Sequence, residues 1–185
     1  MAFGRIARCA AWTALAAGLS ALALTASAQT KVEVDVELVL AVDVSGSMGL
    51  DELRLQRGGY VSAFRHPDVI GAIESGLIGR IAVIYFEWGG PGRYRVVVPW
   101  TGISNAEEAN ALADTLELIT PRNQRGTSIS GALAQGREFL RNSGFRGLRQ
   151  VIDVSGDGPN NMGDPLTDQR DKTLEQGIVI NGLPL

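Results

Sequence analysis

The sequence predicts an α/β fold: a three-layer, doubly wound, mostly parallel sheet with one antiparallel edge strand. The first observation is a set of short, continuous apolar runs, such as residues 38–42, which are typical of strands buried on both faces. The second is that helix-like patterns separate these runs along the chain. The third is a glycine- and proline-containing turn at residues 88–92, which joins two strand patterns directly and so predicts a hairpin.

The first half of the chain contains three predicted strands and one predicted helix. Residues 32–37 alternate valine with acids and run into the apolar stretch 38–42, so we expect a strand that becomes buried. An amphipathic helix is predicted at residues 50–64, and His66-Pro67 ends it. The type of residues 70–78 stays open. Strands at residues 80–86 and 94–98 form the hairpin.

The second half is predicted to alternate helices and strands. Ser104 is expected as an N-cap, with Glu107 completing a capping box, and that helix reaches about Leu118. A helix at 128–141, a strand at 149–154, a polar loop at 155–164, a helix at 166–176 and a strand at 178–180 follow. We expect the last strand to be buried on both faces. Because nothing after Leu185 covers it, we expect the domain to be C-terminally incomplete.

The N-terminus is predicted to be a secretory signal peptide covering residues 1–28. Arg5 and Arg8 precede an apolar run, and Ala26-Ser27-Ala28 is an A-x-A cleavage pattern, which places cleavage before Gln29. An uncleaved membrane anchor is the alternative. The folded domain is then 29–185, in a periplasmic or secreted protein that has no membrane span after cleavage.

Charge and cysteine content narrow the class of partner. Residues 1–28 contain two arginines and no acid, so their removal changes the net charge from −3 to −5. An acidic surface disfavours nucleic acid and anionic membranes as partners. Cleavage also removes Cys9, the only cysteine, so the mature chain has no intramolecular disulfide.

Oxygen-bearing side chains follow two of the predicted buried strands and open one helix. Asp43, Ser45 and Ser47 end the first strand, Asp157 follows the fourth, and Thr127 comes directly before a helix. In an open parallel sheet the carboxyl ends of the strands share one rim, so we expect these five side chains to converge. Oxygen ligands without His or Cys suit a hard cation. Two acids give little charge for an all-protein Ca²⁺ site, which favours Mg²⁺, with Mn²⁺ or Ca²⁺ possible.

The order Asp43-x-Ser45-x-Ser47, then Thr127, then Asp157-Gly158 resembles the metal-ion-dependent adhesion site of von Willebrand factor A (VWA) and integrin I-type domains. The resemblance implies that Ser45, Ser47 and Thr127 bind Mg²⁺ with Asp43, while Asp157 acts through water. It also implies a non-enzymatic module whose protein partner supplies an acidic residue to the metal. Where the family commonly has threonine before the last aspartate, this chain has Gly156. The segment 151–161 also resembles secreted bacterial VWA proteins of unknown function.

Several polar or aromatic residues near this rim have two interpretations each. A structural hydrogen bond is favoured for Asp153 over a place at the metal. For four further residues, contact with a partner and an ordinary role in a loop or in the core both stay open. His66 is interpreted as a surface residue, and Ser128 as a helix-start residue that could support the site. The residues with open roles are Glu87, Trp88, Asn160 and Asn161.

Two other functions are kept as alternatives. A Mg²⁺-dependent hydrolase would use the same two acids, but the chain has no P-loop, no G-x-S-x-G motif and no acid at position 45. A structural subunit with a vestigial metal site is the other alternative. Turnover of a phosphate ester would identify the first, and absent metal affinity the second.

Overall fold

The computed structural model describes residues 30–185 and confirms the predicted fold class. Five strands form one sheet in the order β3-β2-β1-β4-β5. Their bounds are Val32–Asp43 (β1), Ile81–Trp88 (β2), Tyr94–Ile103 (β3), Phe145–Gly156 (β4) and Val179–Pro184 (β5). β3 pairs antiparallel with β2 at one edge, and all other pairs are parallel. The predicted signal peptide lies outside the described residues and stays a prediction.

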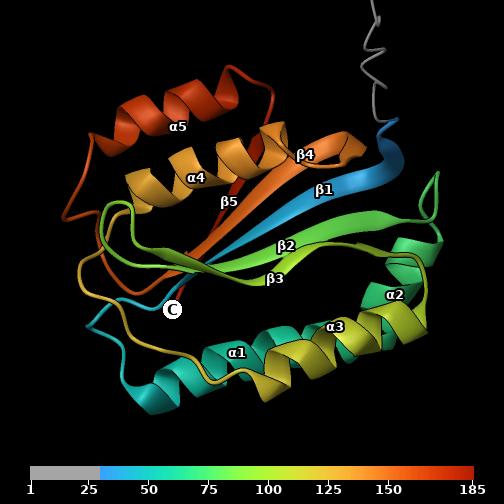
Figure 1. Ribbon diagram of the computed structural model, residues 1–185, viewed down its shortest axis with the longest axis horizontal. Coiled ribbons are helices and arrows are strands. Elements are labelled where there is room, and N and C mark those ends of the chain that lie inside the picture. The colour runs from blue at the N-terminus through green and yellow to red at the C-terminus, as the bar shows by residue number, and fades with distance from the viewer. Residues whose placement is uncertain (1–29) are drawn as a thin grey trace, which may run out of the picture.

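Helices cover both faces of the sheet, which gives three layers (Figure 1). On one face lie α1 (Leu50–Arg65), α2 (Pro67–Glu74) and α3 (Ala106–Leu118). On the other lie α4 (Ile129–Arg141) and α5 (Leu166–Leu174). Each connection from a parallel strand to the next passes through a helix, as the alternating sequence pattern requires. No helix within residues 30–185 combines the length and apolar character needed to cross a membrane.

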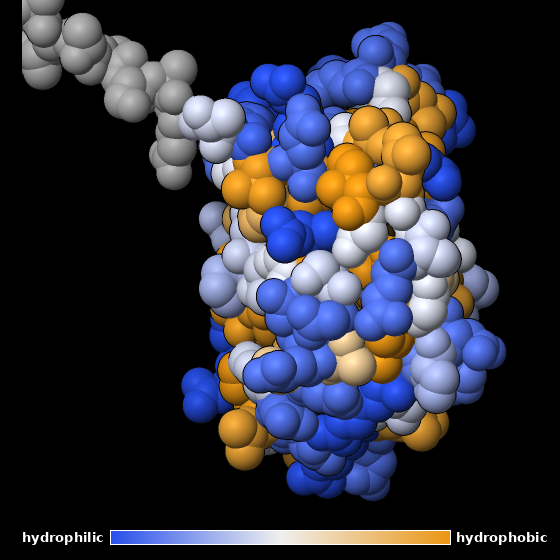
Figure 2. Space-filling model, turned by 90° about the vertical axis from the view of Figure 1, so that its right-hand side faces the viewer, coloured by the Kyte–Doolittle hydropathy of each residue, from blue (hydrophilic) through white to orange (hydrophobic). Residues whose placement is uncertain are grey.

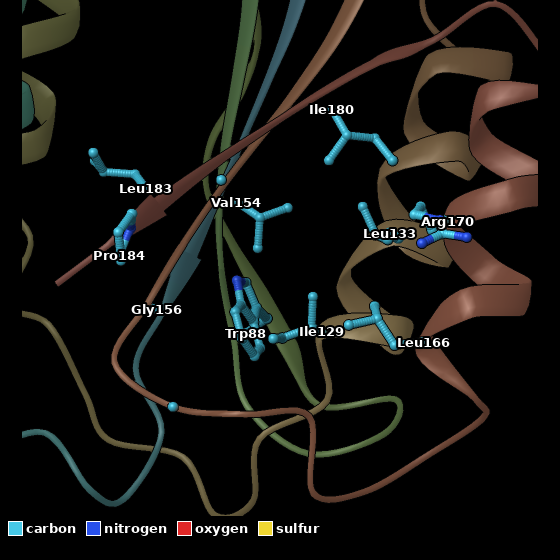
Figure 3. Close-up of a pocket in the computed structure, with 12 residues that line it drawn as sticks. Trp88, Ile129, Leu133, Val154, Gly156, Leu166, Arg170, Ile180, Leu183 and Pro184 are labelled. Carbon is cyan, nitrogen blue, oxygen red and sulfur yellow. The ribbon is translucent and has the colours of Figure 1, made fainter.

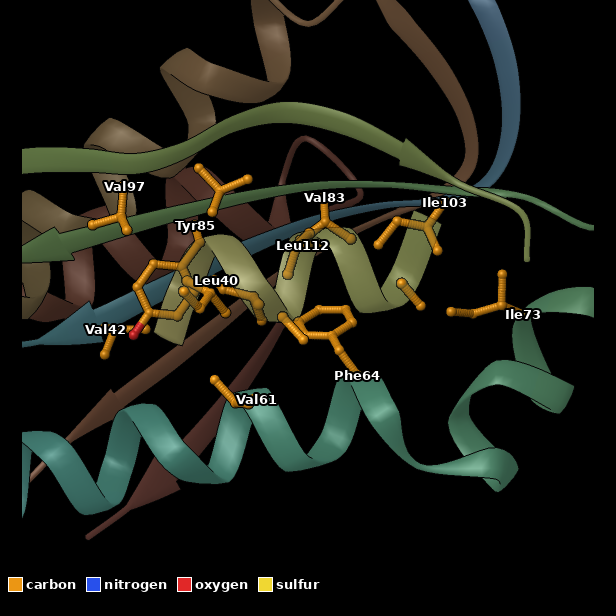
Figure 4. Packing of buried hydrophobic residues seen from close by; sticks show 14 residues of the cluster. Leu40, Val42, Val61, Phe64, Ile73, Val83, Tyr85, Val97, Ile103 and Leu112 are labelled. Atoms are coloured by element: carbon orange, nitrogen blue, oxygen red, sulfur yellow. The ribbon is translucent and has the colours of Figure 1, made fainter. Parts of the chain in front are cut away.

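β1 shows why a continuous apolar run becomes a central strand. Side chains alternate between the two faces of a strand, so consecutive apolar residues bury both. Leu40 and Val42 pack into the core under α1 and α3, whereas Val39 and Ala41 pack into the core under α4. The first core also contains Phe64 of α1, and Figure 4 shows it among the strand side chains. β1, which lies between β2 and β4, is therefore held by apolar packing on both of its faces.

The structure assigns one segment that the sequence left open and corrects the start of one helix. Residues 70–78, left open above, belong mostly to α2, which Pro67 starts and the His66 side chain caps by accepting from Asp68 N at 3.2 Å. The N-cap of α3 is Asn105 rather than Ser104: its Oδ1 accepts from Glu108 N at 2.9 Å. Ser104 instead donates to the Glu108 carboxylate from both its backbone and its hydroxyl. The N-cap is thus shifted by one residue, and the Glu108 carboxylate accepts from Ser104 rather than from the N–H of the N-cap residue.

The last strand is also not buried as predicted. β5 lies at the sheet edge, most of its residues are exposed, and Val179 is 37% exposed. Only Ile178, just before the strand, is fully enclosed, and Ile180 packs against the α4 core. An apolar run of three residues does not distinguish an edge strand from a central one. Whether the domain continues beyond Leu185 stays a prediction.

Figure 2 shows the end of the molecule at which the parallel strands begin. Hydrophilic residues dominate this face, and the hydrophobic residues form separate patches among them. The loops after the carboxyl ends of β1 and β4 lie at the opposite end of the sheet. That opposite end carries the predicted site.

Candidate metal centre

Asp43 is the last residue of β1 and is fully buried between β2 and β4. Its Oδ1 accepts a hydrogen bond from Ser45 N at 2.7 Å. Its Oδ2 is buried and has no hydrogen-bond donor among the residues that the structure describes. Burial raises the pKa of Asp43, and the hydrogen bonding of Ser45 opposes this rise only in part. A buried carboxylate oxygen without a partner is costly, so this position fits a cation.

Three more of the predicted residues form a hydrogen-bonded chain beside Asp43. The hydroxyls of Ser45 and Ser47 lie 3.0 Å apart, and Ser47 Oγ donates to Asp157 Oδ1 at 3.0 Å. Ser45 is buried, whereas Ser47 and Asp157 are exposed. The structure therefore brings together side chains that are 110 positions apart in sequence. One side of this group faces solvent, which leaves access for a ligand.

Thr127 lies in the neighbouring loop and is buried, but its contacts are with another segment. Its N–H donates to Asn161 Oδ1 at 3.1 Å, and its carbonyl accepts from Asn161 N at 3.0 Å. The same loop reaches the end of β1, where Gln124 N donates to the Val44 carbonyl at 2.7 Å. No hydrogen bond within residues 30–185 joins the Thr127 hydroxyl to the other four side chains. Thr127 is therefore connected to the site through its loop, which reaches the end of β1, and not through a hydrogen bond of its own hydroxyl.

Glycine is required at two positions around these residues. A Cβ on Gly156 would lie 2.9 Å from Asp43 Oδ2, so the unpartnered oxygen occupies the space that a side chain would need. Gly126 has φ +83°, in the left-handed region, and a Cβ there would lie 3.1 Å from Gly90 Cα. Gly156, the residue before Asp157, thus has no hydroxyl, and its backbone lies close to the Asp43 carboxylate.

The loop after β4 is held against the start of α4. Asn160 Oδ1 accepts from Ser130 N at 3.0 Å, in addition to the Asn161 contact with Thr127. Ser128 caps α4, because its hydroxyl accepts from Gly131 N at 3.1 Å. The asparagines therefore have structural roles that connect two of the loops carrying the candidate ligands. The structure therefore shows a loop role for both asparagines, and partner contact at them stays a prediction.

The other residues near the rim have structural roles as well. Asp153 accepts from Asn181 Nδ2 at 2.7 Å, in agreement with the interpretation favoured from the sequence. Glu87 is buried and accepts from Arg57 and from Arg95, the latter at 2.6 Å. Trp88 is only 2% exposed, so the idea of an exposed aromatic anchor is wrong. It is instead part of the core under α4.

Two supporting contacts had no signal in the sequence. Asn123 Nδ2 donates to the Met48 carbonyl at 2.6 Å and so holds the loop that follows β1. Ser155 is buried, and its hydroxyl accepts from Gln56 Nε2 at 2.9 Å and from the Tyr60 hydroxyl at 3.1 Å. These contacts fix α1 against β4 next to Asp157. Nothing in the residue pattern distinguishes them from ordinary loop and helix-surface positions.

The chemistry of this group is that of oxygen donors. No cluster of three His, Cys, Asp and Glu side chains occurs in the part of the chain that the structure describes. A metal held here would thus need the serine or threonine hydroxyls in addition to the two carboxylates. His66 lies beyond the far end of α1, about 24 Å along a helix of that length, and so is remote from Ser45.

Solved structures with a similar fold come from several kinds of protein. Proximal thread matrix protein 1 from the mussel byssus aligns with a TM-score of 0.55 at 17% identity, over 82% of this chain and 38% of that protein. The pilus adhesin SpaC from Lactobacillus rhamnosus GG aligns with a TM-score of 0.59 at 18% identity, over 84% of this chain and 25% of the adhesin. An aerotolerance-related membrane protein from Bacteroides fragilis gives a TM-score of 0.51 at 22% identity, over 80% and 67% of the two chains.

These similarities show a VWA-like fold. The chain spans between a quarter and two fifths of the length of the mussel and pilus proteins. No curated protein matches it in sequence. One family matches residues 33–185, which is almost all of the chain that the structure describes. The chain therefore belongs to the family described as "Protein of unknown function (DUF1194)".

Proposed function

We propose that this chain is a metal-dependent protein-binding module of an exported protein. The observation that carries the proposal is Asp43: a fully buried carboxylate with one satisfied oxygen and one oxygen that lacks a donor within residues 30–185. A buried charged group needs a partner, and a cation can both pair with the carboxylate charge and occupy its free oxygen. The adjacent hydroxyls of Ser45 and Ser47 supply further oxygen ligands of the kind that hard cations prefer.

In this proposal Asp43, Ser45, Ser47 and Thr127 hold a divalent cation, and Asp157 contributes through water. Mg²⁺ is the proposed ion, because the group offers two carboxylates and several neutral oxygens; Mn²⁺ or Ca²⁺ are the alternatives. When bound, the ion supplies a coordination position that an aspartate or glutamate of a partner protein completes. Ser47 and Asp157 form the exposed side of the group, where that carboxylate would approach.

Two of the similar structures support a binding role. One mussel byssus structure is described with a zinc-occupied metal-ion-dependent adhesion motif, and aligns at 16% identity with a TM-score of 0.55. The SpaC protein is described as a pilus adhesin. We carry both properties over to this chain only as part of the proposal. Its predicted periplasmic or secreted location is compatible with the same role.

Calorimetric titration with Mg²⁺ tests the metal site. We expect Asp43→Ala to abolish binding, because the substitution removes the buried charge that the hydroxyls cannot replace. Asp153→Ala is the matched control: it removes a half-buried carboxylate from the same end of β4, and we expect it to leave Mg²⁺ affinity unchanged. Equal Mg²⁺ affinity in the wild type and Asp43→Ala would refute the site.

Capture of a partner tests the binding function separately. The protein is immobilised and exposed to exported proteins of the source organism, with Mg²⁺ or with EDTA. We expect a protein that is retained only with Mg²⁺, and that is lost with Asp43→Ala but kept with Asp153→Ala. Metal binding without any metal-dependent capture would instead favour a structural role for the ion. Metal-dependent hydrolysis of a phosphate ester would favour the hydrolase alternative.

A further inference from the structure

Two segments beside the candidate metal centre are rich in arginine. Residues 88–95, which include the turn between β2 and β3, and residues 119–127, which lead into α4, contain four arginines and no acid. The chain as a whole has a net charge of −3, so this positive charge is a local feature. The arginines are Arg93, Arg95, Arg122 and Arg125. A local concentration of one charge attracts ligands of the opposite charge.

The two arginine-rich segments are joined to each other. Gly90 N donates to the Arg125 carbonyl at 2.9 Å, and the Gly90 carbonyl accepts from Arg93 N at 2.9 Å. Figure 3 shows the same proximity at the ends of the two elements, with Trp88 of β2 beside Ile129 of α4. The arginines of the turn and those of the loop before α4 therefore belong to adjoining parts of the surface.

The loop before α4 also lies against one of the candidate metal ligands. Gln124 forms an isolated parallel bridge with Ser45. Bridged residues lie about 4.8 Å apart and consecutive Cα atoms about 3.8 Å apart, so the Arg125 Cα lies within roughly 9 Å of the Ser45 Cα. The same count places the Arg122 Cα within roughly 13 Å. These distances are close to the Debye length of about 10 Å at 0.1 M salt, so the arginines act on a carboxylate that approaches the ion.

Three of the four guanidinium groups have no acidic partner among the described residues. Arg95 is held by the buried Glu87 at 2.6 Å. Arg93, Arg122 and Arg125 are exposed and take part in none of the ion pairs within residues 30–185. Arginine presents a planar fork of N–H donors that fits a carboxylate with two hydrogen bonds. These three side chains are therefore available to carboxylates from outside the chain.

We propose that the partner of the metal site is an acidic segment of polypeptide, and that Arg93, Arg122 and Arg125 bind further carboxylates of that segment. The inference rests on the proposed function, because it adds neighbouring acids to the one that reaches the ion. An extended segment advances about 3.3 Å per residue, so roughly 9–13 Å corresponds to about three or four residues. The second acid of the segment therefore lies within about four residues of the first.

Two short peptides separate the arginine contacts from coordination of the ion. One carries three glutamates separated by single glycines, and the other keeps one glutamate and has glutamine at the other two positions. Their binding is followed by fluorescence anisotropy in Mg²⁺ and in EDTA. An exposed ion pair contributes about twofold to affinity, so we expect the peptide with three glutamates to bind about fivefold more tightly in Mg²⁺.

Neutralising the three arginines tests where the additional glutamates bind. We expect the triple variant with Arg93→Gln, Arg122→Gln and Arg125→Gln to lose the preference for three glutamates, while its affinity for the peptide with one glutamate changes less than about threefold. Added salt should lower the preference of the wild type, because exposed charges are screened.

The matched control removes the same amount of charge from the opposite end of the sheet. Lys31, Arg146 and Arg149 are exposed, lie in or next to the first halves of β1 and β4, and take part in no ion pair within the described residues. We expect the variant with glutamine at all three positions to keep the preference. Loss of the preference in both triple variants would contradict the proposal, because net charge alone would then explain it.

Three further results would overturn the proposal. They are equal affinity of the wild type for the two peptides, an unchanged preference in the arginine variant, and tighter binding of sucrose octasulfate than of the peptide with three glutamates, which would assign the loops to a sulfated carbohydrate. The first and third concern the wild-type protein alone, so a folding defect in a variant does not affect them.

The two peptides also distinguish this inference from the proposed function. Equal affinity for both peptides, with binding that requires Mg²⁺, refutes the arginine contacts and leaves the metal site standing. A preference for three glutamates that is the same in EDTA, with no effect of Mg²⁺ on the peptide with one glutamate, supports the arginine contacts and refutes the metal site.

Discussion

The buried carboxylates of the described residues differ in how fully they are hydrogen-bonded. Glu37 accepts from Ser143, from Gly147 N and from Gln150. Glu87 accepts from two arginines, as described above. Asp43 has one donor on one oxygen and none within the described residues on the other. This contrast is the reason for our proposal that Asp43 binds a ligand that is not part of the chain.

Substitution of Gly156 tests this interpretation at the scale of one atom. A Cβ added there would lie 2.9 Å from Asp43 Oδ2, whereas a Cβ on Gly158 would meet nothing within 4 Å. We expect Gly156→Ala to weaken Mg²⁺ binding at least about tenfold, because it pushes on the oxygen that would face the ion. Gly158→Ala, on the other side of Asp157, is expected to bind normally. Calorimetry checks both, and equal affinities would contradict the assigned role of Oδ2.

A pH-dependent contribution to stability is expected from Asp35. Its carboxylate accepts backbone N–H groups of Ile78, Gly79 and Arg80 at 3.0, 2.8 and 3.2 Å. The hydrogen bond from Ile78 has the largest part in lowering the pKa of Asp35, and burial opposes it only partly. A lowered folded-state pKa gives stability that is present above the unfolded-state pKa, about 3.9, and is lost as pH falls through the folded-state value.

Urea unfolding of Asp35→Asn at several pH values measures this contribution. We expect the variant to be less stable than the wild type at pH 7, and the difference to shrink as the pH is lowered below about 4. Glu33→Gln serves as a control, since Glu33 is an exposed acid of the same strand. A difference that stays constant with pH would show that the amide loses packing rather than charge-assisted hydrogen bonds.

At the scale of single elements, the start of α3 depends on Asn105. Its side chain accepts from Glu108 N at 2.9 Å and so satisfies one of the free N–H groups of the first turn. We expect Asn105→Ala to lower the free energy of unfolding by about 1 kcal/mol, and Asn105→Asp to restore most of it. Ser104→Ala should have the larger effect if Ser104 were the cap, as the sequence first suggested. Thermal unfolding of the three variants distinguishes these outcomes.

The sequence predicted the presence of helices and strands more accurately than the residues at which they begin and end. Central strands and amphipathic helices have strong periodic patterns, and β1, α1 and α4 lie where those patterns place them. The cap of α3 was misplaced by one residue because Ser104 and Asn105 are both good caps, each followed three residues later by glutamate. β5 was predicted to be buried because a three-residue apolar run carries no information about its neighbours in the sheet. Strand order, which decides exposure, is a property of the whole fold.

At the scale of the molecule, topology made the meeting of Asp43, Ser45, Ser47 and Asp157 predictable. Parallel strands present their carboxyl ends at one rim, so Asp43 and Asp157 were expected together, and the structure joins them through Ser45 and Ser47. The side of β2 on which Trp88 lies was not predictable, because a residue at a strand end can face solvent or core with the same local pattern.

Thermal unfolding with and without Mg²⁺ tests whether the buried charge of Asp43 destabilises the domain when no ion is bound. Asp43→Asn keeps an oxygen that can accept from Ser45 N but removes the buried charge. In EDTA, we expect this variant to be at least as stable as the wild type, because the wild type then buries an uncompensated carboxylate. Mg²⁺ at a hundred times its dissociation constant should stabilise the wild type by about 2.7 kcal/mol, or roughly 5–10 °C for a domain of this size.

The variant should show no such shift, so the order of stability between the two proteins reverses when Mg²⁺ is added. A general loss of packing at Asp43 predicts a different result, in which the variant is less stable under both conditions. Calcium and manganese titrations of the same pair then rank the ions by the size of the wild-type shift. Because a bound ion stabilises only the folded state, this ranking follows affinity and needs no knowledge of the partner.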